Sequence, residues 1–160
     1  MKTEKRAVPM EEMSPLITGL IAEGVDVTIT VTGNSMKPLL TTHRDTVVLT
    51  QCDPLKLKVG DIPLYKRENG KYILHRIVKV NDTTYDMAGD HQAETEYGVN
   101  KSQVLCVVKA FTRNGKLYTV KNPIYRIYSW LWRIMLPLRG FVMRTHGKLH
   151  KLFKRKGNKK

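Results

Sequence analysis

The chain has 160 residues, two cysteines and a formal net charge of +14. This length suits one domain whose core needs neither disulfides nor metal. The charge argues against a nucleic-acid-binding role for the whole domain, because residues 121–160 hold 12 of the 28 Lys and Arg residues and no acid. Residues 1–120 carry the other 16 bases against 14 acids and are nearly neutral.

The N-terminus is charged and shows no secretory signal, and no run of about twenty apolar residues predicts a membrane span. We therefore expect the body of the protein to stay in the cytoplasm. Cys52 and Cys106 lie in strand-like runs, and we interpret them as two buried thiols rather than a disulfide. No Cys-x-x-Cys or paired-His spacing predicts a metal site, and no cofactor is expected.

The first part of the chain predicts one helix and one strand. Residues 1–10 are expected to be disordered. A helix is predicted to begin at Ser14-Pro15, with Ser as the cap and Pro at the first helical position, and to stop at Gly24. Apolar and polar residues then alternate over residues 25–31, which predicts a half-buried strand leading to residues 33–35.

The middle of the chain predicts a series of short strands. Asn69-Gly70 and Asn114-Gly115 are strong hairpin signals between them. Many short strands with turn residues and little helix predict a mainly β domain over residues 1–120. The strands are expected over residues 46–51, 61–66, 71–80, 83–87, 104–112 and 117–120.

After Asn122-Pro123 the spacing of apolar residues changes from two to three or four. This change predicts an amphipathic, basic helical tail over residues 121–160, interrupted at Pro137 and Gly140 and resumed over residues 141–153. The apolar stripe of its first part comprises Ile124, Ile127, Tyr128, Leu131, Ile134, Met135 and Leu138.

Ser35, His75 and Asp90 follow one another in an order that permits a hydrolytic site. A serine hydroxyl becomes a good nucleophile only when a neighbouring base takes its proton. His75 can be that base near neutral pH, and a carboxylate on its far ring nitrogen would fix its tautomer. The turn at residues 36–38 would hold Ser35 with its backbone N–H facing a developing oxyanion. Serine, histidine and aspartate at such positions are more often structural residues of turns and packed strands, so spacing alone favours the structural reading over catalysis.

Four segments resemble, in order, the motifs of type I signal peptidases and the related self-cleaving SOS-type repressors. Residues 33–40 (GNSMKPLL) resemble the nucleophile box and residues 59–62 (VGDI) a strand entry. Residues 72–78 (YILHRIV) resemble the strand that carries the base, and residues 88–90 (AGD) the Gly-Asp box. His75 stands where the bacterial peptidases and the repressors have lysine. The chain is therefore most similar to the Ser-His type of archaea and the endoplasmic reticulum.

The resemblance implies that Ser35 is the nucleophile and His75 the general base. Asp90 matches the aspartate of the Gly-Asp box and is the first choice for the acid that orients His75. Glu96 is the second choice, because that subfamily has a further aspartate where this chain has acids at 94 and 96. The oxyanion and turn positions are Gly33, Asn34, Met36 and Pro38, of which Gly33 has no side chain to offer as a second oxyanion donor.

The resemblance further implies a signal-peptidase-like fold of coiled β-sheets around a half-barrel core. A proline at position 63 in a strand of that fold predicts an edge or irregular strand. The implied function is that of a serine endopeptidase that cleaves a leader or signal-like segment of a peptide or protein precursor, bound as an added β-strand. The alternative is a catalytically inactive peptide- or membrane-binding module of the same fold.

The tail is interpreted as an in-plane membrane attachment that replaces an N-terminal anchor. Trp130 and Trp132 supply interfacial aromatic rings, and Arg126 and Arg133 suit anionic lipid. A helix that simply packs on the β domain is the first alternative, and nucleic-acid binding, for which no known motif is present, is disfavoured. We thus expect a cytoplasmic protein that is peripheral on the inner membrane face.

Overall fold

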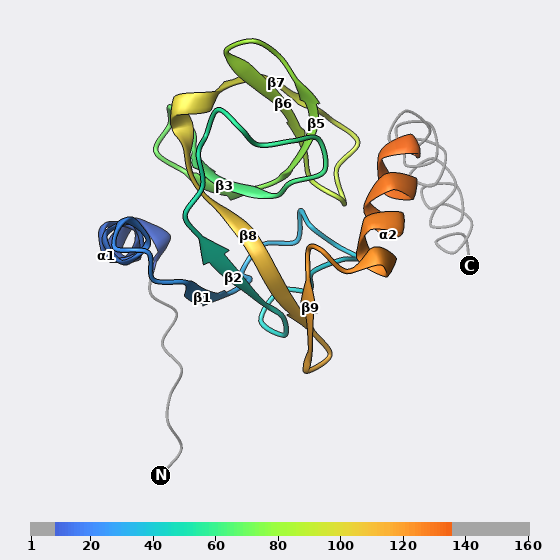
Figure 1. Ribbon diagram of the computed structural model, residues 1–160, viewed down its shortest axis with the longest axis horizontal. Helices are drawn as coiled ribbons and strands as arrows, with labels where there is room; N and C mark the ends of the chain where they lie inside the picture. The colour runs from blue at the N-terminus through green and yellow to red at the C-terminus, as the bar shows by residue number, and fades with distance from the viewer. Residues whose placement is uncertain (1–8, 136–160) are drawn as a thin grey trace, which may run out of the picture.

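The computed structural model describes residues 9–135, which form a mainly β structure with an α-helix near each end (Figure 1). The helices are α1 (Met10–Ala22) and α2 (Pro123–Ile134), and a 3-10 turn, η1 (Lys101–Gln103), precedes the longest strand. The strands are β1 (Val27–Thr30), β2 (Thr46–Thr50), β3 (Pro63–Lys66), β4 (Tyr72–Leu74), β5 (Arg76–Val80), β6 (Thr84–Ala88), β7 (Glu96–Asn100), β8 (Val104–Arg113) and β9 (Lys116–Thr119).

The strands form two antiparallel sheets. The large sheet has the order β1-β2-β8-β3-β4, with β9 also paired to β8, and the small sheet has the order β5-β6-β7. The large sheet curls so that β3 and the small sheet enclose a ring in the upper part of the molecule (Figure 1). The expectation of a mainly β fold is confirmed. One buried cluster joins α1, the large sheet and Tyr125 of α2. The other fills the ring with Tyr65, Ile77, Tyr85, Met87, Val99 and Val104.

The chain passes from the large sheet to the small one at His75. The sequence predicts one strand over residues 71–80, but β4 pairs with β3 in the large sheet and β5 pairs with β6 in the small one. His75 lies between the two ladders, at a corner. Each half has a normal strand pattern, so the break leaves no mark in the alternation of side chains. Strand β7 was also missed, because its residues are mostly polar and include Gly98, whose φ is +72°.

Helix α1 begins earlier than the sequence predicts, with Pro9 as its N-cap and Pro15 inside it. Residues 1–8 lie outside the described part of the chain, whereas residues 9 and 10, also expected to be disordered, belong to the start of this helix. The side chains of Met10 and Met13 pack against the core, and we infer that this packing outweighs the backbone hydrogen bond that Pro15 removes. The predicted stop is confirmed at Gly24, whose φ is +80°.

Both predicted hairpins are present. Gly70 follows β3 with a φ of +82°, and Asn114 and Gly115 have φ values of +49° and +75°, the pair of positive angles that a type I′ turn requires. Pro63 is the first residue of β3, which lies inside the sheet rather than at its edge. The register between β3 and β8 shifts at Leu64/Tyr65, so the strand is irregular, as the proline predicts.

The tail is described only as far as residue 135. The Asn122 side chain caps α2 by accepting hydrogen bonds from the first N–H groups of the helix. The breaks at 137 and 140, Leu138 and the second stretch over 141–153 lie outside the described residues. Between residues 9 and 135, no helix has the length and hydrophobicity to cross a membrane. Both cysteines are free thiols; Cys106 is buried as expected, whereas Cys52 is only half-buried. Burial raises the pKa of Cys52 to about 11 and that of Cys106 to about 12.

Candidate active site

The Ser35 backbone, the His75 ring and the turn at Gly89 lie close together although they are far apart in the sequence. Ser35 lies on a turn after β1, His75 between β4 and β5, and Gly89 directly after β6. The Ser35 carbonyl oxygen accepts a hydrogen bond of 2.7 Å from the His91 N–H. A Cβ placed on Gly89 would lie 2.7 Å from that oxygen and 3.1 Å from Nε2 of His75. Glycine at position 89 therefore permits the serine backbone and the imidazole to approach one another.

The turn that carries Ser35 is held by a backbone hydrogen bond and by one buried side chain. The Lys37 N–H donates to the Asn34 carbonyl at 3.2 Å, which closes the turn around the serine. The side chain of Met36 is buried in the core, whereas Ser35 is half-buried. Gly33 is exposed, and an added Cβ there would meet nothing within 4 Å. The peptide bond before Pro38 is cis.

His75 is buried and has the protonation state that a general base needs. Its side chain is 3% exposed, and burial lowers the pKa of the imidazole to about 4, although the charge of Glu96 acts in the opposite direction. The ring is therefore neutral at neutral pH. A neutral imidazole has one nitrogen that donates a hydrogen bond and one that accepts.

The contacts of Tyr65 determine which nitrogen of His75 accepts. The Tyr65 hydroxyl donates to Oε2 of Glu96 at 2.7 Å and also lies 3.3 Å from Nδ1 of His75. Because the hydroxyl has one proton and gives it to Glu96, we infer that Nδ1 carries the ring proton and donates to the Tyr65 oxygen. The lone pair is then on Nε2, the nitrogen beside Gly89.

Glu96 is the acid that approaches the far side of the ring, with Oε2 4.0 Å from Nδ1 of His75. Arg67 binds both oxygens of this carboxylate, with Nε 2.9 Å from Oε1 and its terminal nitrogen on Oε2. Partial burial by itself would raise the pKa of Glu96, but the hydrogen bonds from Arg67 and Tyr65 lower it. Glu96 is thus held as a carboxylate one hydroxyl away from the imidazole.

Asp90, the first choice for the orienting acid, has a different principal partner. Its two oxygens accept hydrogen bonds of 2.9 and 2.7 Å from Arg76, and both side chains are 1% exposed. This geometry favours the second choice, Glu96, for the role beside His75. The roles of both acids remain predictions.

Helix α2 packs its polar and aromatic face on the Arg76–Asp90 pair. Nη1 of Arg76 donates to the Tyr125 hydroxyl at 2.9 Å and to Oγ of Ser129 at 2.8 Å. The Trp132 indole N–H donates to the Asp90 carbonyl oxygen at 2.9 Å. Trp132 is therefore docked on the β domain, whereas Trp130 and Arg126 are exposed and Arg133 is half-buried.

Sequence reasoning missed the residues that surround the histidine. Tyr65, Arg67 and Arg76 belong to ordinary strand patterns, and only the fold gives them a common location. The docking face of α2 did leave a signal, because its polar and aromatic residues repeat every three or four positions. They are Tyr125, Tyr128, Ser129 and Trp132.

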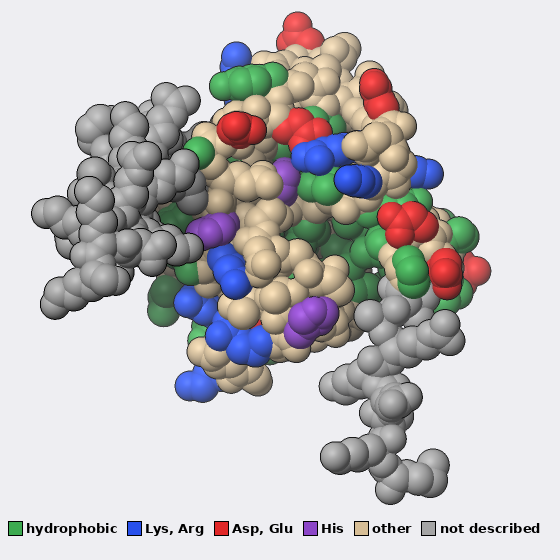
Figure 2. Space-filling view, turned by 180° about the vertical axis from the view of Figure 1, so that it is seen from behind, with side chains coloured by type: hydrophobic (Ala, Val, Ile, Leu, Met, Phe, Trp, Pro, Cys, Tyr) green, Lys and Arg blue, Asp and Glu red, His purple; other side chains and the backbone are tan. Residues whose placement is uncertain are grey.

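The surroundings of Glu96 are open to solvent. A cavity of about 550 Å³ lies beside it, lined by Arg67, Gln92, Ala93, Glu94, Thr95 and Glu96. On the face drawn in Figure 2, acidic and basic side chains lie side by side over the upper part of the molecule, where the small sheet is. Solvent can thus reach the acid while His75 stays buried.

A scan against protein-family models and a search of curated proteins gave no match for this chain.

Proposed function

We propose that this protein is a serine endopeptidase of the signal-peptidase type, with the coiled-sheet fold of that family. The observation that carries the proposal is the approach of the Ser35 backbone and of a buried, neutral His75 to the same glycine, Gly89. The carboxylate of Glu96 behind the other ring nitrogen and the four ordered sequence motifs support it.

In the proposed mechanism, Nε2 of His75 removes the proton of the Ser35 hydroxyl as its oxygen attacks the scissile carbonyl carbon. The resulting oxyanion accepts a hydrogen bond from the Ser35 backbone N–H. The imidazolium then gives its proton to the departing amine, and the acyl group stays on the serine as an ester. Water, deprotonated by the same imidazole, attacks this ester. The imidazolium then returns the proton to the Ser35 oxygen as the ester bond breaks. Glu96 stabilises the imidazolium through the Tyr65 hydroxyl.

The pairing order of the large sheet supports a substrate that binds as an extended strand. Among the described strands, β1 pairs only with β2 and β4 pairs only with β3, so these two strands end the sheet. Ser35 follows the first of them and His75 follows the second. A precursor segment added along these edges would bring its main chain to both residues. We propose a leader or signal-like segment of a peptide or protein precursor as the substrate.

The proposal includes attachment to an anionic membrane surface on the cytoplasmic side through residues 121–160. Helix α2 docks with one face and exposes apolar side chains on the other, and Arg126 lies beside that exposed face. An exposed apolar face with flanking bases is the composition of a helix that lies in the plane of a membrane interface. The exposed side chains are Ile124, Ile127, Trp130, Leu131, Ile134 and Met135.

The test is cleavage of a mixture of leader-like peptides, with the product masses measured by mass spectrometry. Ser35→Ala and His75→Ala should each slow cleavage by at least about a thousandfold. Ser102→Ala makes the same chemical change at an exposed serine and should cleave like the wild type. Equal cleavage by Ser35→Ala and the wild type would reject the proposal. Peptide binding by the wild type without turnover would favour an inactive binding module.

A further inference from the structure

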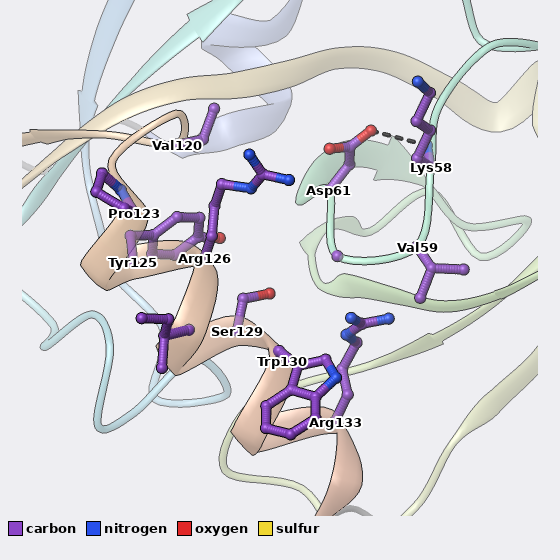
Figure 3. A pocket seen from close by; sticks show the side chains of 12 residues that line it. Lys58, Val59, Asp61, Val120, Pro123, Tyr125, Arg126, Ser129, Trp130 and Arg133 are labelled. Carbon is purple, nitrogen blue, oxygen red and sulfur yellow. Dashed lines mark hydrogen bonds between the residues drawn. The ribbon is translucent and has the colours of Figure 1, made fainter.

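Helix α2 and the turn before β3 enclose a cavity of about 590 Å³ (Figure 3). Its floor is formed where Gly60 meets Ser129, since a Cβ on Gly60 would lie 3.3 Å from the Ser129 Oγ. In Figure 3 the guanidinium groups of Arg126 and Arg133 extend from α2 toward the turn that carries Lys58 and Val59. The cavity therefore lies between the helix, which supplies two guanidinium groups, and a turn that carries both Lys58 and Asp61.

The cavity is electropositive and has an unsatisfied donor. Lys58, Arg126 and Arg133 line it together with one acid, Asp61, whose carboxylate already accepts the Lys58 backbone N–H at 2.8 Å. Nε of Arg133 is buried and has no hydrogen-bond partner within residues 9–135. A buried N–H without an acceptor is costly, so a ligand that brings oxygen atoms and negative charge would suit this site.

One wall of the cavity continues into an apolar surface. Ile127 and Trp130 line it and are 59% and 54% exposed. Leu131 and Ile134 extend this surface along α2 and are about half exposed. A small inorganic anion would satisfy the cations but leave these side chains in water, whereas an amphipathic anion would cover both.

We propose that this cavity binds the phosphate headgroup of an anionic phospholipid while the apolar face of α2 enters the membrane interface. The inference deepens the membrane-surface part of the proposed function and rests on it. The phosphate oxygens accept hydrogen bonds from Arg126 and Arg133, and Trp130 lies at the level of the headgroups. The helix then lies in the membrane plane, with its opposite face still docked on the Arg76–Asp90 pair.

The test is flotation of the full chain with phosphatidylcholine vesicles that contain or lack phosphatidylglycerol. Arg126→Gln/Arg133→Gln should weaken partitioning onto phosphatidylglycerol vesicles by roughly tenfold or more. Lys71→Gln/Lys79→Gln removes the same charge from exposed positions on the β domain and should change it less than about twofold. If the two double variants unfold at the same denaturant midpoint and lose vesicle partitioning to the same extent, the inference is wrong. Absence of any vesicle binding would also remove the membrane part of the proposed function, and neither result bears on peptide cleavage.

Two further measurements distinguish a lipid from other anions. Brominated phosphatidylglycerol chains should quench the fluorescence of the wild type more than that of Trp130→Phe, because Trp130 is the exposed one of the two tryptophans. Equal quenching would contradict insertion at this face. Inorganic phosphate and RNA are tested for binding without vesicles. If one of them binds the wild type but not Arg126→Gln/Arg133→Gln, while the double variant still binds vesicles, the cavity binds that soluble anion and the lipid proposal is wrong.

Discussion

Two carboxylate–guanidinium pairs lie near the candidate base, and they differ in burial. The Arg76–Asp90 side chains are each 1% exposed, whereas those of Arg67 and Glu96 are 32% and 28% exposed. Arg76 directly follows His75, and Asp90 directly follows Gly89. Because successive side chains in extended chain point in opposite directions, one residue of each dipeptide faces the site and the other faces α2. The two dipeptides, at residues 75–76 and 89–90, thus supply both the candidate site and the ion pair that packs against α2.

The difference in burial predicts different roles for Asp90 and Glu96. A buried pair with both oxygens bound holds the Gly89 turn and α2 in place, and breaking it leaves an uncompensated charge in the interior. A half-exposed pair contributes little to stability but keeps a negative charge beside the imidazole. Stability should therefore depend on Asp90 and the rate of cleavage on Glu96.

The largest expected effect is on stability. Asp90→Asn should lower the free energy of unfolding by about 3–5 kcal/mol, because Arg76 would remain buried without its counter-charge. Glu96→Gln should lower it by about 1 kcal/mol or less. Urea denaturation of the two variants beside the wild type measures this difference. A Glu96 variant that loses more stability than the Asp90 variant would reverse the comparison.

The second effect is on the rate. Glu96→Gln should lower kcat/KM for a cleaved peptide by roughly a hundredfold, because the imidazolium formed during proton transfer loses its negative neighbour. Glu94→Gln removes an exposed acid two positions away and serves as the control. The assignment of Glu96 fails if the two variants retain the same activity.

A smaller loss is expected when the bridge between acid and base is removed. Tyr65→Phe keeps the buried ring but removes the hydroxyl that contacts both Glu96 and His75, and should lower kcat/KM by roughly tenfold. In the double variant Tyr65→Phe/Glu96→Gln, the fold-loss in kcat/KM should be smaller than the product of the two single fold-losses, because both residues act through the same hydrogen-bonded path. Tyr85→Phe, in the same buried cluster, is the matched control. Fully multiplicative losses would argue for independent roles.

The smallest expected effect is the dependence of stability and rate on pH, which is weak near neutrality and arises from protonation of His75. Its pKa in the folded protein, about 4, is below the value of about 6.5 in an unfolded chain. The unfolded state therefore binds the proton more readily between these values, and stability should fall as pH decreases from about 6.5 toward 4. The rate should decline only below about pH 5, as the base is protonated. A rate that already falls with an apparent pKa near 6.5 would show that the histidine is solvated.

The sequence predicted local structure where a short segment determines it. Asn114-Gly115 specifies its turn through two positive φ angles, and Gly24 ends its helix for the same kind of reason. The start of α1 was misplaced because Ser14-Pro15 has the form of a helix start, while the packing that decides the outcome involves residues elsewhere. The corner at His75 was missed for a related reason, since only pairing with two different sheets breaks the strand.

The candidate site shows the same limit. The motifs identified Ser35 and His75 as candidates, but not which acid stands beside the ring. The residues of the Gly-Asp box pointed to Asp90, whereas the nearer carboxylate is Glu96, brought there by β7, a strand that the sequence did not reveal. Long-range pairing determines such proximity, and spacing along the chain does not report it.

The most direct test of the central claim needs no substrate. In Ser35→Cys, the thiol introduced at position 35 should form an ion pair with His75 and react with iodoacetamide at about pH 6 at least tenfold faster than in Ser35→Cys/His75→Ala. Burial raises the pKa of Cys52 and Cys106, so both react slowly and peptide mapping can separate them. Faster alkylation that depends on His75 is the result we predict. Equal rates in the two variants would contradict a nucleophile–base pair at this site.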